Sequence, residues 1–248
     1  MSRHLPRASF NSSRLIRLLA ELVAEAVGDP RQVRPAPPPF AERLGQWLGF
    51  TDAIALSGAL NAKPGRTPDL SLCVDEAQPE RAALNRVRAA LIASIRGDSS
   101  TQSGRARIRL PAQPRLVPEE GAAEVVFSPY RRYYMAHQRE IASALGQLRA
   151  DLRAALARCS PALAQLAAID GVLDQALGER ERNLLAGIPD LLEQHFVRLR
   201  SKPATGLPAL GWLNPFVADM QAILFAELEL RLQPALGLLA ALEDAPSS

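Results

Sequence analysis

The chain has 248 residues, 48% of them apolar and only 5% aromatic, so it can bury a sizeable core built mainly from leucine and alanine. Those residue types favour helix over sheet. The net charge of +3 is too small to require a polyanionic partner, and no apolar run approaches the length of about 18 residues that predicts a transmembrane helix.

The N-terminal part of the chain predicts short helices separated by connections rich in proline and glycine. A capped helix is expected over residues 11–27. After a proline-rich spacer, the segment Phe40–Leu60 predicts one broken helix or two short ones. A turn over residues 61–69 then precedes an amphipathic helix over Pro79–Arg96.

Residues 97–118 interrupt this pattern, because they hold little that can be buried. We therefore expect a flexible linker there, between an N-terminal helical region (residues 1–96) and a C-terminal helical bundle (residues 119–248). Residues 1–118 carry 17 basic and 10 acidic side chains, whereas residues 119–248 carry 12 and 16, so the two halves differ in the sign of their charge.

The C-terminal half contains three pairs in which a capping residue precedes proline: Ser128-Pro129, Ser160-Pro161 and Asn214-Pro215. Each pair predicts a helix whose first residue is the proline. The predicted helices cover roughly residues 129–158, 161–185, 189–201 and 215–242. Pro234 should kink the last of them.

A stripe of mostly aliphatic residues runs through the first two of these helices at spacings of three and four residues. Its members are Ile141, Leu145, Leu148, Leu152, Leu156, Cys159, Leu163, Leu166, Ile169, Leu173 and Leu177. Such a stripe requires a partner helix, either from the same chain or from another subunit. The expected fold is therefore mainly α, a multi-helix bundle, and both a homodimer and an intramolecular bundle remain open.

All three tyrosines fall within residues 127–139, a segment that also carries arginines. Clustered Tyr and Arg are typical of protein interfaces and of surfaces that stack on bases. On one helix, the three tyrosines and the histidine share a face that the arginines flank. The partner-binding hypothesis comprises Tyr130, Arg131, Arg132, Tyr133, Tyr134 and His137. The alternatives are internal packing with the hydroxyls at the surface, or stacking on nucleic acid, which the acidic C-terminal half disfavours.

Four arginines of the linker are candidates for contact with an anionic partner: Arg105, Arg107, Arg109 and Arg115. Guanidinium groups can neutralise phosphates or carboxylates. The linker is thus either a solvated spacer or a segment that folds on such a partner, and a short edge strand over residues 105–109 is a further alternative. The corresponding alternative function is a nucleic-acid-associated protein that uses these arginines and the basic N-terminal half.

The chain shows no recognisable catalytic, cofactor-binding or metal-binding motif. Its histidines, His4, His137 and His195, have no metal-ligand spacing, and phosphate-binding loops and nucleophile elbows are missing. We therefore predict no catalytic residue, no cofactor and no metal ligand, with an enzyme of unrecognised type as a second alternative. The two cysteines, Cys73 and Cys159, favour a reducing compartment, and no signal-peptide pattern precedes them. The expected localisation is the cytoplasm, and Cys159 is expected in the core.

Two segments, Phe10–Leu19 (FNSSRLIRLL) and Phe40–Ile54 (FAERLGQWLGFTDAI), resemble an uncharacterised proteobacterial family described only as a domain of unknown function. Its members are about as long as this chain. The resemblance implies a bacterial source, but no activity, cofactor or catalytic residue. Genes of that family lie beside genes for envelope proteins of the proton-channel and peptidoglycan-binding kind, so the resemblance also implies a cytoplasmic accessory to a membrane complex.

These features together predict a non-enzymatic helical adaptor or assembly protein. Its partner is expected to be another protein rather than nucleic acid, and the tyrosine and arginine segment is the predicted contact.

Overall fold

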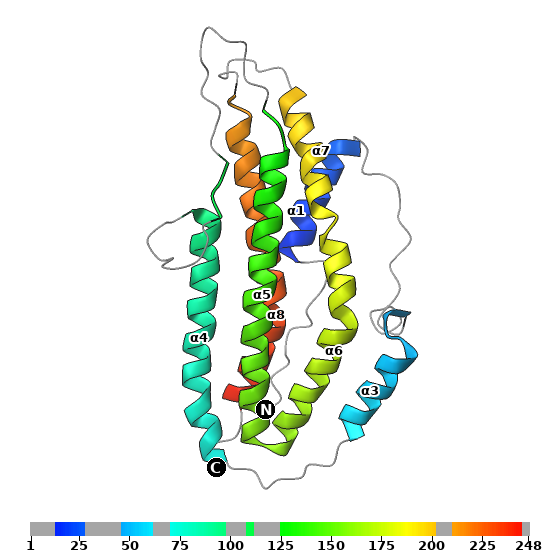
Figure 1. The fold of residues 1–248 in the computed structure, drawn as a ribbon, viewed down its shortest axis with the longest axis vertical. Helices are drawn as coiled ribbons and strands as arrows, with labels where there is room; N and C mark the ends of the chain where they lie inside the picture. Colours follow the sequence, from blue (N-terminus) through cyan, green and yellow to red (C-terminus); the bar gives the residue numbers. More distant parts are fainter. Residues whose placement is uncertain are drawn as a thin grey trace, which may run out of the picture. The chain divides into compact units, whose positions relative to one another are not determined.

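A computed structural model describes residues 13–27, 46–61, 70–97, 108–111, 125–201 and 210–244. All regular secondary structure within these ranges is helical, which confirms the mainly α prediction (Figure 1). The labelled helices are α1 (Arg14–Val27), α3 (Phe50–Asn61), α4 (Leu70–Arg96), α5 (Ser128–Cys159), α6 (Pro161–Leu185), α7 (Ile188–Ser201) and α8 (Leu213–Glu243).

The bounds of α5, α6, α7 and α8 agree with the predicted helices to within two residues at each end. Helix α4 is longer than predicted, because it begins at Leu70 and carries Pro79 in its interior. The prediction that this helix starts at Pro79 is therefore wrong. A proline removes one backbone donor from the helix, and the remaining hydrogen bonds of a long helix can compensate for that loss.

Only one of the three predicted proline starts has the expected geometry. The Ser160 side chain accepts a hydrogen bond from the backbone amide of Leu163 at 3.2 Å, with Pro161 in the first turn of α6. This contact confirms the cap that the sequence predicts.

The other two helices include the predicted capping residue: α5 begins at Ser128 itself, and α8 begins at Leu213, one residue before Asn214. In α5 the first backbone carbonyl to accept is that of Phe127, from Tyr130 at 2.9 Å, so Ser128 already lies inside the first turn. In α8 the carbonyl of Trp212 accepts from Phe216 at 3.3 Å. The cap predictions for Ser128 and Asn214 are therefore wrong. In both helices the residue before the first helical one, Phe127 or Trp212, packs its ring against Phe196.

The chain divides into two compact units, and each unit combines segments from both halves of the sequence. Unit 1 comprises Met1–Gln32, Ile92–Glu140 and Ile188–Arg231, and unit 2 comprises Val33–Leu91, Ile141–Gly187 and Leu232–Ser248. Helices α4, α5 and α8 contribute residues to both units. Most of the segment 97–118 lies outside the described residues, so the linker and the division of the chain there stay predictions.

Aromatic rings from α5, α7 and α8 form the core of unit 1. The ring centroid of Phe196 lies 5.1 Å from that of Phe216 and 5.0 Å from that of Trp212, and the ring centroid of Tyr130 lies 5.4 Å from that of Phe216. These pairs meet edge to face, the arrangement that the quadrupoles of aromatic rings favour. Trp212, from the turn before α8, thus closes one side of the aromatic core.

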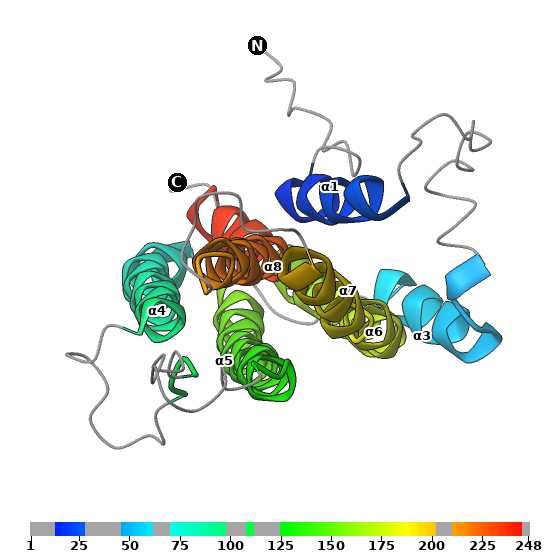
Figure 2. The ribbon, with the colours of Figure 1, turned by 90° about the horizontal axis from the view of Figure 1, so that it is seen from above.

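Helix α1 packs beside α7 in unit 1, as both views show (Figures 1 and 2). It buries Leu15 and Leu22, which are two helical turns apart on one face. The guanidinium of Arg198 on α7 donates to the backbone carbonyl of Leu22 at 3.1 Å. A polar contact thus supplements the apolar docking of α1.

In unit 2 every residue of the aliphatic stripe of α5 is buried. Its buried members are Ile141, Leu145, Leu148, Leu152, Leu156 and Cys159. Cys159 is almost wholly enclosed, which confirms its predicted place in the core.

Helix α3 lies along α6 in the same unit (Figures 1 and 2). The Gln165 side-chain amide donates to the backbone carbonyls of Ala59 at 3.3 Å and Leu60 at 2.5 Å. Near the other end of α6, the guanidinium of Arg180 lies 5.2 Å from the ring centroid of Trp47. Because the start of α3 meets the end of α6, the two helices are antiparallel.

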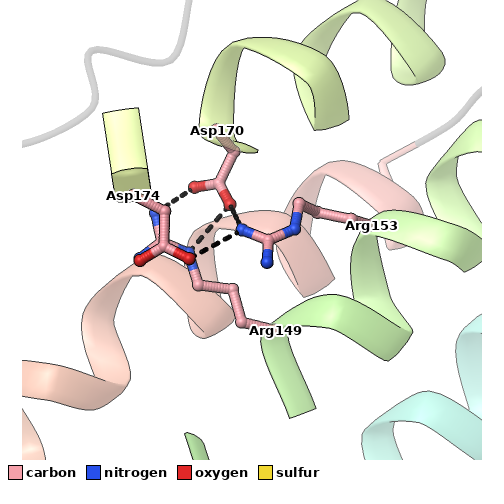
Figure 3. Close-up of polar contacts among 4 residues, drawn as sticks. All are labelled: Arg149, Arg153, Asp170 and Asp174. Atoms are coloured by element: carbon pink, nitrogen blue, oxygen red, sulfur yellow. Dashed lines mark hydrogen bonds and ion pairs between the residues drawn. The ribbon is translucent and has the colours of Figure 1, made fainter. Parts of the chain in front are cut away.

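An ion-pair cluster joins α6 to α5 in unit 2 (Figure 3). Arg149 donates two hydrogen bonds to Asp170, from Nε at 2.8 Å and from Nη2 at 2.5 Å, and a third from Nη1 to Asp174 at 2.8 Å. Arg153 places Nη1 at 3.0 Å from both carboxylates. Burial opposes the charge of Arg149, but the hydrogen bonds and negative charge of Asp170 outweigh it and raise the pKa of Arg149. The cluster fixes the rotation of α6 against α5.

Candidate functional site

The tyrosine segment of α5 is part of the core of unit 1. Tyr130, Tyr133, Tyr134 and His137 are all buried, so the exposed aromatic surface that the partner-binding hypothesis assumed is wrong. The physical reason is that α7 and α8 supply apolar rings and polar partners for this face, and the helical spacing of the segment could not reveal them. The alternative of internal packing with surface hydroxyls is also incomplete, because two of the hydroxyls form interior hydrogen bonds.

Tyr134 and Glu227 form the centre of a buried polar cluster between α5 and α8. The Tyr134 hydroxyl donates to Glu227 Oε2 at 2.7 Å, Gln138 Nε2 donates to the same oxygen at 3.1 Å, and Arg231 Nη2 lies 2.9 Å from Oε1. Burial and the negative charge of Glu227 hold the pKa of Tyr134 well above its usual value of 10.0. The Tyr134 hydroxyl thus supplies one of the hydrogen bonds that the buried Glu227 side chain needs in the core.

Tyr133 closes the C-terminal end of α4 rather than contacting a partner. Its hydroxyl donates to the backbone carbonyl of Ile95 at 2.8 Å, and the Gln221 side chain of α8 donates to the same carbonyl at 3.0 Å. This carbonyl belongs to the last turn of α4, where no further helical amide can reach it. Side chains from α5 and α8 therefore cap α4 in three dimensions.

His137 belongs to a neighbouring polar group of unit 1. Its Nδ1 lies 3.2 Å from Glu140 Oε2, and the hydroxyl of Ser94 donates to the same oxygen at 2.8 Å. Because a carboxylate only accepts, Nδ1 carries the proton of this pair. The other ring nitrogen, Nε2, is buried and meets no hydrogen-bonding group among the described residues.

The arginines of the tyrosine segment lie nearer the surface. Arg131 pairs with Asp190 at 2.8 Å and with Glu193 at 3.4 Å, both on α7, while Arg132 is exposed. Exposed pairs of this kind contribute little stability. Arg131 and Arg132 are therefore the members of the predicted site that a partner could reach.

Among the four linker arginines, only Arg109 is described, and it is exposed. Arg105, Arg107 and Arg115 lie outside the described residues. Residues 108–111 have no regular secondary structure, so the described part of that segment forms no edge strand.

The structure assembles a second histidine cluster that no sequence spacing indicated. His195 Nε2 lies 2.8 Å from Asp219 Oδ2 on α8, and Arg198 Nη2 lies 2.7 Å from His195 Nδ1. Because arginine only donates, Nδ1 accepts and Nε2 donates to the carboxylate. The only available signal was the spacing of three between His195 and Arg198, which is too common to single out. This cluster connects α8 to the contact of Arg198 with α1.

The largest exposed apolar side chains of α3 form a different kind of candidate site. No residue of α3 is buried, and Phe50 is 84% exposed and Ile54 57% exposed. The half-buried side chains of α3, Asp52, Leu56 and Ala59, recur at the spacing of one helix face, and Phe50 and Ile54 lie on the opposite face. We call Phe50 and Ile54 the outer face of α3.

The described residues contain no group of three or more His, Cys, Asp or Glu side chains placed to hold a metal ion. No helix in the same part of the chain is long and apolar enough to cross a membrane.

The helices and buried polar clusters define a mainly α protein whose interior side chains tie α4, α5, α7 and α8 together within unit 1. Residues 1–244 match the family described as "Protein of unknown function (DUF3348)", and the chain belongs to that family. This match confirms the resemblance to a family of unknown function. No curated protein and no solved structure matches the chain.

Proposed function

We propose that the protein is a non-enzymatic helical adaptor that binds a protein partner through the outer face of α3. The supporting observation is that this helix buries none of its residues and yet carries Phe50 and Ile54, two large apolar side chains, in solvent. Contiguous apolar groups of this kind typically mark interaction surfaces. The proposed partner contact is therefore on α3 and not on the buried tyrosines of α5.

The chemistry of this face favours the apolar side of a partner helix. Asp52 is the only charged residue of α3, and its carboxylate accepts from the backbone amide of Gly49 at 2.9 Å, as a helix cap does. Ser57 and Gly58 are exposed and small, and a Cβ added to Gly58 would meet nothing within 4 Å. A shallow, uncharged surface flanked by large apolar side chains suits a helix docked along it. It offers no cation to a phosphate backbone.

The proposed setting is the bacterial cytoplasm, beside a membrane complex. This part of the proposal rests on the resemblance of the N-terminal segments to the proteobacterial family. Fractionation of the source cells tests it directly, because the protein should then be found in the cytosolic fraction and partly with membranes.

The experiment compares three tagged proteins expressed in the native cells: the wild type, the double variant Phe50→Asp/Ile54→Asp, and the control Val197→Asp. Val197 is 50% exposed on α7, so the control introduces an aspartate in place of an exposed apolar side chain away from α3. None of the three positions is buried, and circular dichroism should show unchanged helix content. Each protein is purified with and without nuclease, and a photo-crosslinking residue at position 50 captures the contacting peptide.

We expect the wild type and Val197→Asp to retain one set of proteins after nuclease and the double variant to lose it. The peptide crosslinked to position 50 should come from an amphipathic helical segment of one of those proteins. Equal retention by the double variant would refute the proposal, and loss of all bound material with nuclease would favour the nucleic-acid alternative.

A further inference from the structure

A series of polar contacts extends from α8 through α7 to α1 within unit 1, and His195 lies at its centre. His195 is 3% exposed, and its two ring nitrogens meet charged groups of opposite sign. Nε2 lies 2.8 Å from a carboxylate oxygen of Asp219, and Nδ1 lies 2.7 Å from Nη2 of Arg198. The same guanidinium donates from Nη1 to the backbone carbonyl of Leu22 on α1 at 3.1 Å. The protonation state of His195 therefore bears on a contact that holds α1.

The contact with Arg198 requires the neutral form of His195. A guanidinium has donors only, so Nδ1 of the ring must accept with its lone pair. An imidazolium carries a proton on both nitrogens, and Nδ1 would then be a donor that faces a donor. Two positive charges would also lie at hydrogen-bonding distance, which disfavours the charged form of the ring. Protonation of His195 is thus incompatible with the position of the Arg198 guanidinium.

The contact with Asp219 favours the opposite form of the ring. Nε2 donates to the carboxylate whether or not His195 is charged, and a positive charge on the ring strengthens that hydrogen bond. The Asp219 side chain is 49% exposed, so this edge of the cluster is open to solvent. His195 can therefore gain a proton while it stays bound to Asp219, but Arg198 then has to move.

The other charged groups of the helices packed around His195 have different contacts. From α5, Arg131 pairs with Asp190 and Glu193 on α7. The charged side chains of α1 that the structure describes are all exposed, namely Arg14, Arg17 and Glu21. Among the described residues, the charges in contact with the His195 ring are thus those of one carboxylate and one guanidinium.

We propose that protonation of His195 is a switch that loosens α1 from α7 as the pH falls below neutral. In the neutral form, the Arg198 guanidinium is held between His195 Nδ1 and the carbonyl of Leu22, and α1 is docked. In the protonated form, the ring stays on Asp219 and the guanidinium leaves both of its acceptors. Histidine is the side chain whose ordinary titration falls between about pH 5 and 8, so acidification within that range operates the switch.

The first test measures hydrogen exchange of the α1 backbone amides at about pH 7.5 and about pH 5.5, on either side of the ordinary histidine titration. Each rate is divided into the intrinsic rate of an unfolded peptide at the same pH, which gives the protection. Protection of α1 in the wild type should fall about tenfold at the lower pH, the effect of losing a hydrogen bond from a charged donor, while α8 keeps its protection.

Two variants separate His195 from other groups that titrate. His195→Gln should abolish the pH dependence, because its amide can donate to Asp219 and accept from Arg198 at either pH. The matched control His137→Gln changes the other buried histidine of unit 1 and should keep the pH dependence of α1.

The second test compares two midpoints in the full chain. The NMR signals of the His195 ring nitrogens give the pH at which the ring gains its proton, and this pH should coincide with the midpoint of α1 release. Asp219→Asn keeps an acceptor for Nε2 and removes the negative charge, so both midpoints should shift together to lower pH. Constant α1 protection while the ring gains its proton would overturn the proposal. A ring that stays neutral down to about pH 5, or a pH dependence that persists in His195→Gln, would do the same.

Discussion

The hydroxyl of Tyr134 offers a direct measurement of what the buried polar cluster contributes to stability. Tyr134→Phe removes the donor that lies 2.7 Å from Glu227 Oε2 and keeps the contacts of Gln138 and Arg231 with the carboxylate. A hydrogen bond to a buried charged group contributes about 1.5–3 kcal/mol to the free energy of unfolding. We expect Tyr134→Phe to lower that free energy by this amount.

Tyr130→Phe is the matched control, because Tyr130 lies one turn earlier in α5 and is also buried. Its ring packs on Phe196 and Phe216, and its hydroxyl has no hydrogen-bond partner among the described residues. Removing that hydroxyl should change the free energy of unfolding by less than about 0.5 kcal/mol.

The assay is urea unfolding followed by the fluorescence of Trp212, in a background where Trp47→Phe removes the second tryptophan. Trp212 packs on Phe196 in unit 1 and therefore reports the unit that contains the cluster. Equal stabilities of Tyr134→Phe and Tyr130→Phe would show that the Glu227 carboxylate does not depend on this donor, and would refute the reasoning.

Three further changes test other contacts. The pKa of Tyr134 is raised above 10.0, so its contribution to stability is complete below about pH 10 and is lost as the pH rises further; alkaline titration should destabilise the wild type more than Tyr134→Phe. Arg149→Lys removes the bidentate hydrogen bonds to Asp170 and should lower the free energy of unfolding by about 1 kcal/mol, more than Arg153→Lys does, in urea unfolding followed by circular dichroism. Equal decreases for the two variants would contradict the geometry. Arg198→Gln removes the guanidinium that donates to the carbonyl of Leu22, so the backbone amides of α1 should exchange hydrogen faster while those of α8 do not. Unchanged exchange in α1 would show that its buried leucines alone hold it in place.

Local sequence signals were sufficient for most of the helices. The apolar period of α5, α6, α7 and α8 places their bounds within two residues, because helix formation depends on neighbours three and four positions away. The cap at Ser160 was predictable for the same reason. At Ser128 and Asn214 the local signal failed, because Phe127 and Trp212 gain contacts with a distant helix, at Phe196, that outweigh a capping preference.

The candidate sites depended on partners that are remote in the sequence. Tyr134 meets Glu227 at a separation of 93 residues, and Tyr133 meets Ile95 across 38. A helical face of tyrosines is compatible with the core and with the surface alike, and only the helices packed against it determine which. The exposed face of α3 escaped sequence analysis because its apolar residues resemble those of a buried helix.

The sequence by itself determined the helical class, the positions of most helices and the spacing of the aliphatic stripe in α5 and α6, since these follow from residue type and period along one chain. Tertiary structure decided which apolar faces are covered. The stripe of α5 is buried while that of α6 stays partly open, although both have the same period, because burial depends on the number of neighbouring helices and not on the helix itself.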